Sequence, residues 1–93
     1  MTVRFSALAR QELEDAKTYY ALLQDNLDQL FEEDVREKIH IIKEFPLLYP
    51  RVSDRLHRAV MYRFPYNIFY YVKNKTITVV SIAHQHRKPF YTV

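Results

Sequence analysis

Apolar and polar residues follow a helical period through most of the first half of the chain. In the first helical run the apolar positions share one side and are Leu8, Leu13, Ala16, Tyr20 and Leu23. In the second run they recur at steps of three and four residues and are Leu27, Phe31, Val35, Ile39 and Ile42. Ser6 is a favoured N-cap residue, so we predict that the first helix begins at Ala7. Pro46 follows Phe45 and ends the second helix, because proline lacks the amide hydrogen that a helix needs.

The two predicted helices are separated only by Gln24, Asp25 and Asn26. A connection this short makes neighbouring helices pack antiparallel, so we expect a helical hairpin. Aspartate is also a favoured N-cap residue, and we predict that Asp25 caps the second helix.

The second half of the chain is rich in residues that favour strands. Residues 66–72 and 77–82 flank Lys73-Asn74-Lys75 and predict an antiparallel hairpin. Asn74 is expected at positive φ in the turn, because asparagine tolerates the left-handed region better than other residues except glycine. Residues 55–64 alternate between two faces and predict a further strand. One face carries Leu56, Arg58, Val60 and Tyr62, and the other carries His57, Ala59, Met61 and Arg63.

Shorter segments complete the predicted order of elements. Residues 2–5 are β-prone and precede the first helix, so they predict an edge strand. Residues 47–54 are expected to form an ordered loop, and Pro65 marks a bulge or turn because it cannot donate to a strand ladder. The sequence therefore predicts one α+β domain over residues 1–93, with the order β-α-α-β-β-β. We expect an antiparallel meander of the last three strands, a helical hairpin on one face of a small, mostly antiparallel sheet, and an opposite face that is only partly covered.

Charge is divided unequally between the two halves of the chain. Residues 1–45 hold ten acidic residues and six Lys or Arg, a net charge of −4, whereas residues 46–93 hold one acid, Asp54, and eight Lys or Arg, a net charge of +7. Such a division indicates a polyanion or an acidic protein as partner for the basic half. The structural alternative is that the helices carry solubilising acids and the sheet edge carries protective cations.

Composition excludes several kinds of protein. No apolar run approaches the roughly 20 residues of a membrane span, and the N-terminus lacks the apolar run of a signal peptide, so we expect a cytoplasmic protein that does not contact a membrane. The absence of cysteine excludes disulfides and thiolate sites. The absence of glycine excludes the usual phosphate-binding loops, and no cofactor is predicted.

Candidate chemistry is concentrated near the end of the chain, where His84, His86, Arg87, Lys88 and Tyr91 occur together. The His84-x-His86 spacing is expected to place the two imidazoles on opposite faces of a strand, which disfavours a shared metal. A serine hydrolase site at Ser53 or Ser81 would need a distant carboxylate and is set aside.

Metal-independent RNA cleavage stays open, with His84 or His86, Tyr91, Arg63 and Arg87 as acid, base and charge-stabilising groups. The structural alternative is that these positions only pack. On that reading Tyr62, Tyr66 and Tyr70 fill the sheet, His40 and His57 are surface or helix residues, and the Arg58 stem is buried beside a helical acid.

Several segments in the same order resemble the RelE/ParE superfamily of type II toxin–antitoxin toxins, in its plasmid-stabilisation branch. They are VRFSALARQELEDAKTYY, EFPLLYPRV, RAVMYRFPYNIFYYV and ITVVSIAHQHRKPFY, which cover essentially the whole chain. The most specific parts are Arg63-Phe64-Pro65-Tyr66 and Ile82-Ala83-His84 followed by Arg87-Lys88-Pro89.

The resemblance implies a compact β-α-α-β-β-β toxin that a cognate antitoxin neutralises by wrapping it in a hetero-oligomeric complex. ParE-like members poison DNA gyrase without being known to cleave RNA, whereas RelE-like members cleave mRNA on the ribosome. The helical hairpin and the Phe-Pro-Tyr strand favour the ParE side. The alternative is a metal-independent endoribonuclease that uses His84, His86, Arg87 and Tyr91. For target or antitoxin binding we predict Arg58, Arg63, Tyr66, His84, Arg87 and Lys88.

Overall fold

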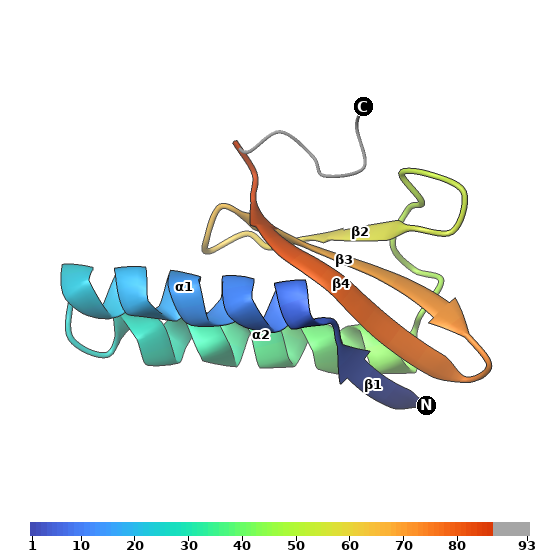
Figure 1. Ribbon diagram of the computed structural model, residues 1–93, viewed down its shortest axis with the longest axis horizontal. Coiled ribbons are helices and arrows are strands. Elements are labelled where there is room, and N and C mark those ends of the chain that lie inside the picture. The colour runs from blue at the N-terminus through green and yellow to red at the C-terminus, as the bar shows by residue number, and fades with distance from the viewer. Residues whose placement is uncertain (87–93) are drawn as a thin grey trace.

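The protein is a helical hairpin packed on one face of a four-stranded sheet (Figure 1). A computed structural model describes residues 1–86. In chain order the elements are β1 (Thr2–Phe5), α1 (Ala7–Leu23), α2 (Leu27–Glu44), β2 (His57–Val60), β3 (Tyr66–Lys73) and β4 (Thr76–His84). The strand order is β1-β4-β3-β2, in which β1 lies parallel to β4 and the other pairs are antiparallel. The predicted α+β class, the order of elements and the meander are confirmed.

The start of α1 is fixed by Ser6, as predicted. Its Oγ accepts a hydrogen bond from the Ala9 amide at 3.0 Å and donates one to the Val80 carbonyl at 2.9 Å, which ties the helix to β4. The predicted burial is wrong for the first and last apolar positions of this helix. Leu8 and Leu23 are 49% and 59% exposed. For Leu23 the reason is that α1 extends beyond the sheet at its C-terminal end (Figure 1).

The start of α2 differs from the prediction. Asn26 is the N-cap and not Asp25, and it makes no capping hydrogen bond through its side chain. The φ of Asn26 is 68°, in the left-handed region that asparagine tolerates. The tight turn between the helices requires this conformation at the N-cap, and so it selects Asn26 and not Asp25. The C-terminal end agrees with the prediction, since α2 ends at Glu44 and Phe45 takes an extended φ before Pro46.

Aromatic rings fill the core between the helices and one end of the sheet. Tyr20 of α1 and Phe31 of α2 meet Phe64 and Tyr66, with ring centroids 4.8 Å apart for Tyr20 and Phe64 and 5.0 Å apart for Phe31 and Tyr66. All four side chains are at most 9% exposed. This cluster fixes the position of the segment before β3 relative to both helices.

The β3–β4 hairpin turns through two residues at positive φ, Asn74 at 52° and Lys75 at 60°. The prediction for Asn74 is confirmed. The second positive φ falls on Lys75 because a two-residue turn that matches the strand twist needs the left-handed region at both positions. A bulge between Phe69 and Tyr70 shifts the register along the same hairpin.

β2 is shorter than the alternating pattern predicted. It ends at Val60, because Met61 and Phe64 turn into the core and the Met61 amide closes the hairpin by donating to the Tyr66 carbonyl at 2.9 Å. Tyr62 is 88% exposed in this turn and does not pack in the sheet.

Two aromatic side chains occupy the helix-side face where β2 and β3 pair. Tyr70 is fully buried, and its hydroxyl donates to the Pro46 carbonyl at 2.7 Å. His57 stacks on it with ring centroids 5.0 Å apart and is 7% exposed, so the expectation of a surface histidine at this position is wrong. These contacts hold the loop after α2 against the sheet.

A carboxylate covers the part of β4 that β1 does not reach. β1 ends at Phe5, opposite Val79, and beyond this point Glu12 of α1 accepts hydrogen bonds from the Ser81 hydroxyl at 2.7 Å and the Ile82 amide at 2.9 Å. An open strand edge is a site of unwanted pairing, so Glu12 both satisfies and protects these groups.

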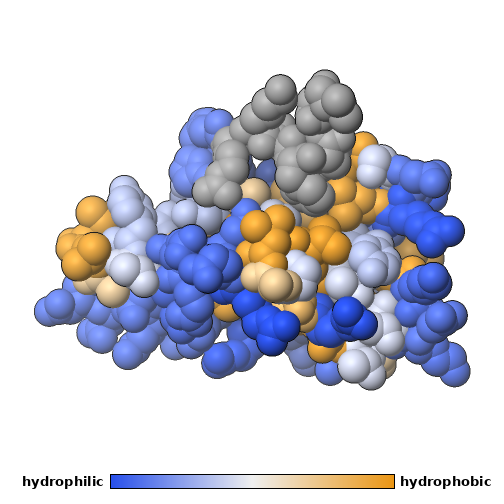
Figure 2. Space-filling model, viewed as in Figure 1, coloured by the Kyte–Doolittle hydropathy of each residue, from blue (hydrophilic) through white to orange (hydrophobic). Residues whose placement is uncertain are grey.

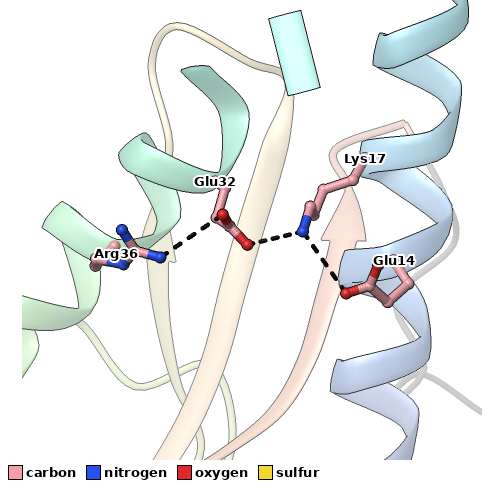
Figure 3. A network of polar contacts seen from close by, with 4 residues as sticks. All are labelled: Glu14, Lys17, Glu32 and Arg36. Carbon is pink, nitrogen blue, oxygen red and sulfur yellow. Dashed lines mark hydrogen bonds and ion pairs between the residues drawn. The ribbon is translucent and has the colours of Figure 1, made fainter. Parts of the chain in front are cut away.

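The two helices are joined across their outer side by an ion-pair network (Figure 3). Lys17 Nζ lies 2.8 Å from Glu32 Oε2 and 3.7 Å from Glu14, and Glu32 also pairs with Arg36 at 3.6 Å. The hydrogen bond raises the pKa of Lys17 and lowers the pKa of Glu32. The Lys17 and Glu32 side chains are partly exposed to water, so their ion pair adds little to the stability of the fold. Its main effect is to set how α1 and α2 align along the helical hairpin.

Candidate functional site

The candidate site lies where β3 begins and β4 ends. Tyr66 and His84 are directly opposite each other in the β3–β4 ladder, and their ring centroids are 5.2 Å apart. Tyr66 is 9% exposed because its other side packs on Phe31. The strand pairing therefore presents His84 on a rigid aromatic support.

His86 lies beside His84, with ring centroids 5.2 Å apart. The prediction that the two imidazoles occupy opposite faces is wrong, because residues two apart in a strand face the same side. β4 itself ends at His84, and His86 belongs to the following turn. The His86 amide donates to His84 Nδ1 at 3.1 Å. Nδ1 is thus an acceptor, and a neutral His84 carries its proton on Nε2.

Gln85 holds this turn against the loop that precedes β3. Its Nε2 donates to the carbonyls of Met61 at 3.0 Å and Tyr66 at 3.2 Å, and its amide donates to the Pro65 carbonyl at 2.7 Å. Sequence reasoning missed this residue. A neutral side chain that bonds to distant backbone carries no periodic or charge signal.

The two predicted arginines within the described residues are not beside His84. Arg63 Nε lies 3.5 Å from Asp34 on α2, so its charge is directed toward the helix. Arg58 is opposite Phe69 in the ladder and hence on the helix-free face, which makes the predicted helical acid beside it wrong. Its Nε is buried and makes no hydrogen bond with any residue from 1 to 86.

The remaining predicted site residues, Arg87, Lys88 and Tyr91, lie outside the described residues. Within residues 1–86, no three His, Asp or Glu side chains are grouped closely enough to hold a metal ion. What this end of the sheet offers is a pair of adjacent imidazoles. Such a pair can exchange protons or donate hydrogen bonds to a partner.

A second surface feature lies at the tip of the helical hairpin, where α1 ends. Figure 2 shows an apolar patch at this end (left in the view), and the exposed side chains there are Tyr19, Leu22 and Leu23, at 56%, 84% and 59%. Exposed apolar groups that lie together are typical of sites where another protein binds.

The family model of the ParE toxin of the type II toxin–antitoxin system parDE matches residues 3–89. This chain belongs to the ParE toxin family. The match covers both helices and β2 to β4 in full and β1 from Val3, and it makes the chain a type II toxin. The resemblance seen in the sequence is confirmed at the level of the family.

A solved structure described as the chromosomal ParDE TA system from P. aeruginosa shares the ParE fold of this chain. The TM-score is 0.66 at 18% sequence identity, with 90% of this chain and 95% of the other covered. At that identity the likeness concerns the fold alone. A comparison with curated proteins gave no match. Among the described residues, neither helix has the length and apolar character needed to cross a membrane.

Proposed function

We propose that this ParE-family toxin inhibits DNA gyrase through protein–protein contacts and is neutralised by a cognate antitoxin. The observation that carries the proposal is the match to the ParE toxin family over residues 3–89. The placement of the cations supports it. Arg63 is paired with Asp34 and Arg58 lies on the opposite face of the sheet, so within residues 1–86 neither guanidinium is directed at His84 as stabilisation of a phosphorane would need.

The alternative is a ribosome-dependent endoribonuclease without a metal. The observation that favours it is the contact between His84 and His86, because two adjacent imidazoles are suited to general acid–base catalysis. Arg87 and Tyr91 would supply the remaining groups in that mechanism.

Purified gyrase and purified ribosomes separate the two functions. We expect the protein to reduce supercoiling or to accumulate cleaved DNA–gyrase complexes, and to leave ribosome-bound mRNA intact. If mRNA is cut only with ribosomes, and the double variant H84A/H86A lowers the cutting rate by about 100-fold or more, the nuclease is the correct function. H40A is the matched control, because His40 is an exposed helix histidine whose partner is Glu44 on the same helix.

The antitoxin is expected to carry an acidic, extended segment that lies on the basic half of the chain. Residues 46–93 carry a net charge of +7, and the helix-free face of the sheet presents Arg58. Apolar contacts would supply lasting affinity, since attraction between exposed charges is screened within about 8–10 Å at physiological salt.

Expression in a bacterial host tests the toxin and antitoxin together. The chain alone should stop growth, and co-expression of the neighbouring open reading frame should restore it. Normal growth with soluble, folded toxin in the cell would contradict the proposal.

A further inference from the structure

A cleft of about 490 Å³ lies at the other end of the sheet from His84, between the loop after α2 and the last residues of β3. In Figure 1 this loop runs from the end of α2 to the start of β2. Leu47, Pro50 and Val72 form apolar walls, His57 contributes an imidazole, and Arg51 and Arg55 contribute two guanidinium groups. The cleft shares no lining residue with the His84 end, so it is a separate candidate binding site.

Backbone hydrogen bonds make the loop rigid. The Val52 amide donates to the Leu56 carbonyl at 2.8 Å, and the Arg58 amide donates to the Pro50 carbonyl at 3.0 Å. Arg51 also forms an isolated antiparallel bridge with His57. The cleft is therefore formed before any ligand arrives, which lowers the entropic cost of binding.

The imidazole of His57 has a fixed orientation beneath this loop. Its Nδ1 lies 2.8 Å from the Tyr49 carbonyl, which can only accept, so Nδ1 carries the proton and Nε2 is an acceptor in the neutral ring. Stacking on Tyr70 holds the plane of the ring. The apolar walls therefore enclose one polar group of defined direction.

The two arginines give the cleft unneutralised positive charge. Arg51 donates to the Asp54 carbonyl at 3.1 Å, and neither Arg51 nor Arg55 forms an ion pair with any carboxylate of residues 1–86. Both side chains are exposed. Guanidinium groups without a carboxylate partner bind carboxylates or phosphates through paired hydrogen bonds.

We propose that this cleft binds an acidic protein segment, with a carboxylate on Arg51 and Arg55 and an apolar side chain against Leu47, Pro50 and Val72. The aliphatic walls of Leu47, Pro50 and Val72 favour a peptide, because its aliphatic side chains can fill them, whereas sugars and phosphates cannot and bases stack on aromatic rings. The carboxylate of Asp54 on the rim also opposes a continuous polyanion, whereas a peptide can place its acid away from it. The proposed binding of an acidic segment does not depend on whether the protein is toxic or inhibits gyrase, so the two proposals can fail separately.

The test uses the whole chain and a peptide probe, acetyl-Glu-Leu-Asp-Leu-Glu-amide, followed through amide chemical shifts. We expect shifts at Leu47, His57 and Val72 with a dissociation constant on the order of 1 mM or below. R51Q/R55Q should weaken binding by about five-fold or more, since two charged hydrogen-bonding groups are lost. R4Q/R10Q is the matched control, because it removes two exposed charges far from the loop in sequence and should change binding by less than about two-fold.

Two further probes decide the class of partner. The uncharged peptide acetyl-Gln-Leu-Asn-Leu-Gln-amide should bind at least about five-fold more weakly. Equal binding of the two peptides, or no shift in this cleft with the acidic peptide, would overturn the proposal. Tighter binding of a ten-nucleotide oligothymidylate at the same residues would also overturn it and assign the cleft to nucleic acid.

Discussion

Replacing Tyr70 with phenylalanine removes a single oxygen from the centre of the molecule. The Tyr70 ring is 0% exposed, and its hydroxyl is hydrogen-bonded to the Pro46 carbonyl at 2.7 Å. Burial raises the pKa of Tyr70 to about 12, because an ionised phenolate is poorly solvated there. The substitution should therefore have opposite effects on stability at neutral and at alkaline pH.

At pH 8 the wild-type hydroxyl is neutral in both the folded and the unfolded state. Y70F then lacks the hydroxyl that donates to the Pro46 carbonyl, so this carbonyl loses its hydrogen bond. The free energy of unfolding should fall by about 1 kcal/mol. For a domain of this size that corresponds to a fall in melting temperature of roughly 4–8 °C.

At alkaline pH the wild-type protein loses stability that Y70F cannot lose. The folded pKa of Tyr70 lies above the unfolded value of about 10, so its contribution is fully present below pH 10 and declines as pH rises toward 12. The decline is about 1.4 kcal/mol at pH 11 and approaches about 2.7 kcal/mol above pH 12. The two proteins should therefore be about equally stable near pH 11.

Urea unfolding of wild type and Y70F at pH 8, 10, 11 and 11.5 measures this crossover. Other groups titrate in both proteins, so their effects cancel in the difference between the two. Y62F is the matched control, because Tyr62 is 88% exposed and its removal should shift stability by less than about 0.5 kcal/mol at any of these pH values. A stability difference between wild type and Y70F that stays constant from pH 8 to pH 11.5 would refute the proposed burial of the hydroxyl.

Three further predictions concern single polar contacts. E12A should lower the free energy of unfolding, measured by urea denaturation, by about 2 kcal/mol. The reason is that the buried Ser81 hydroxyl and Ile82 amide on β4 lose their acceptor. A loss below about 0.5 kcal/mol would contradict this role. E32Q should lower the free energy of unfolding by only about 0.5 kcal/mol at pH 7 and by nothing at pH 2. The pKa of Glu32 is lowered in the folded state, so the stability from its pairing with Lys17 is present above the unfolded pKa and is lost as pH falls. An equal cost at both pH values would argue against the ion pair. In stopped-flow binding of the antitoxin, R58E should slow association several-fold more than R10E, because Arg58 lies on the helix-free face. Raised salt should slow association while changing dissociation little, and equal effects of the two variants would place the antitoxin on another face.

Elements with a repeating pattern could be predicted from the sequence. The helices, the β3–β4 hairpin and the cap at Ser6 follow from periodicity and from local side-chain preferences, and the structure has them at or within a few residues of the predicted bounds. Asp25 and Asn26 show the limit of such rules. Both are favoured caps, and the choice between them depends on a left-handed turn that the packing of the two helices imposes.

The candidate site was less predictable because its geometry depends on where one strand ends. His84 and His86 would share a face even if β4 continued, and the turn after His84 fixes their rings 5.2 Å apart. Gln85 and Glu12 act through bonds to backbone groups distant in sequence. Such contacts arise only from the assembled fold and leave no trace in residue spacing.

The parallel pairing of β1 with β4 has a consequence for how the toxin is made. Ser6 and Val80 are joined across 74 positions of the chain, so the first strand has no partner until β4 has been synthesised. At about 5–20 residues per second, translation leaves that strand unpaired for roughly 4–15 s. The turn that carries His86 is made later still, so the pair of imidazoles is among the last features of the described fold to form. Residues 7–44 can form the helical hairpin during that interval, whereas the site at the end of β4 cannot form until β4 itself has been made.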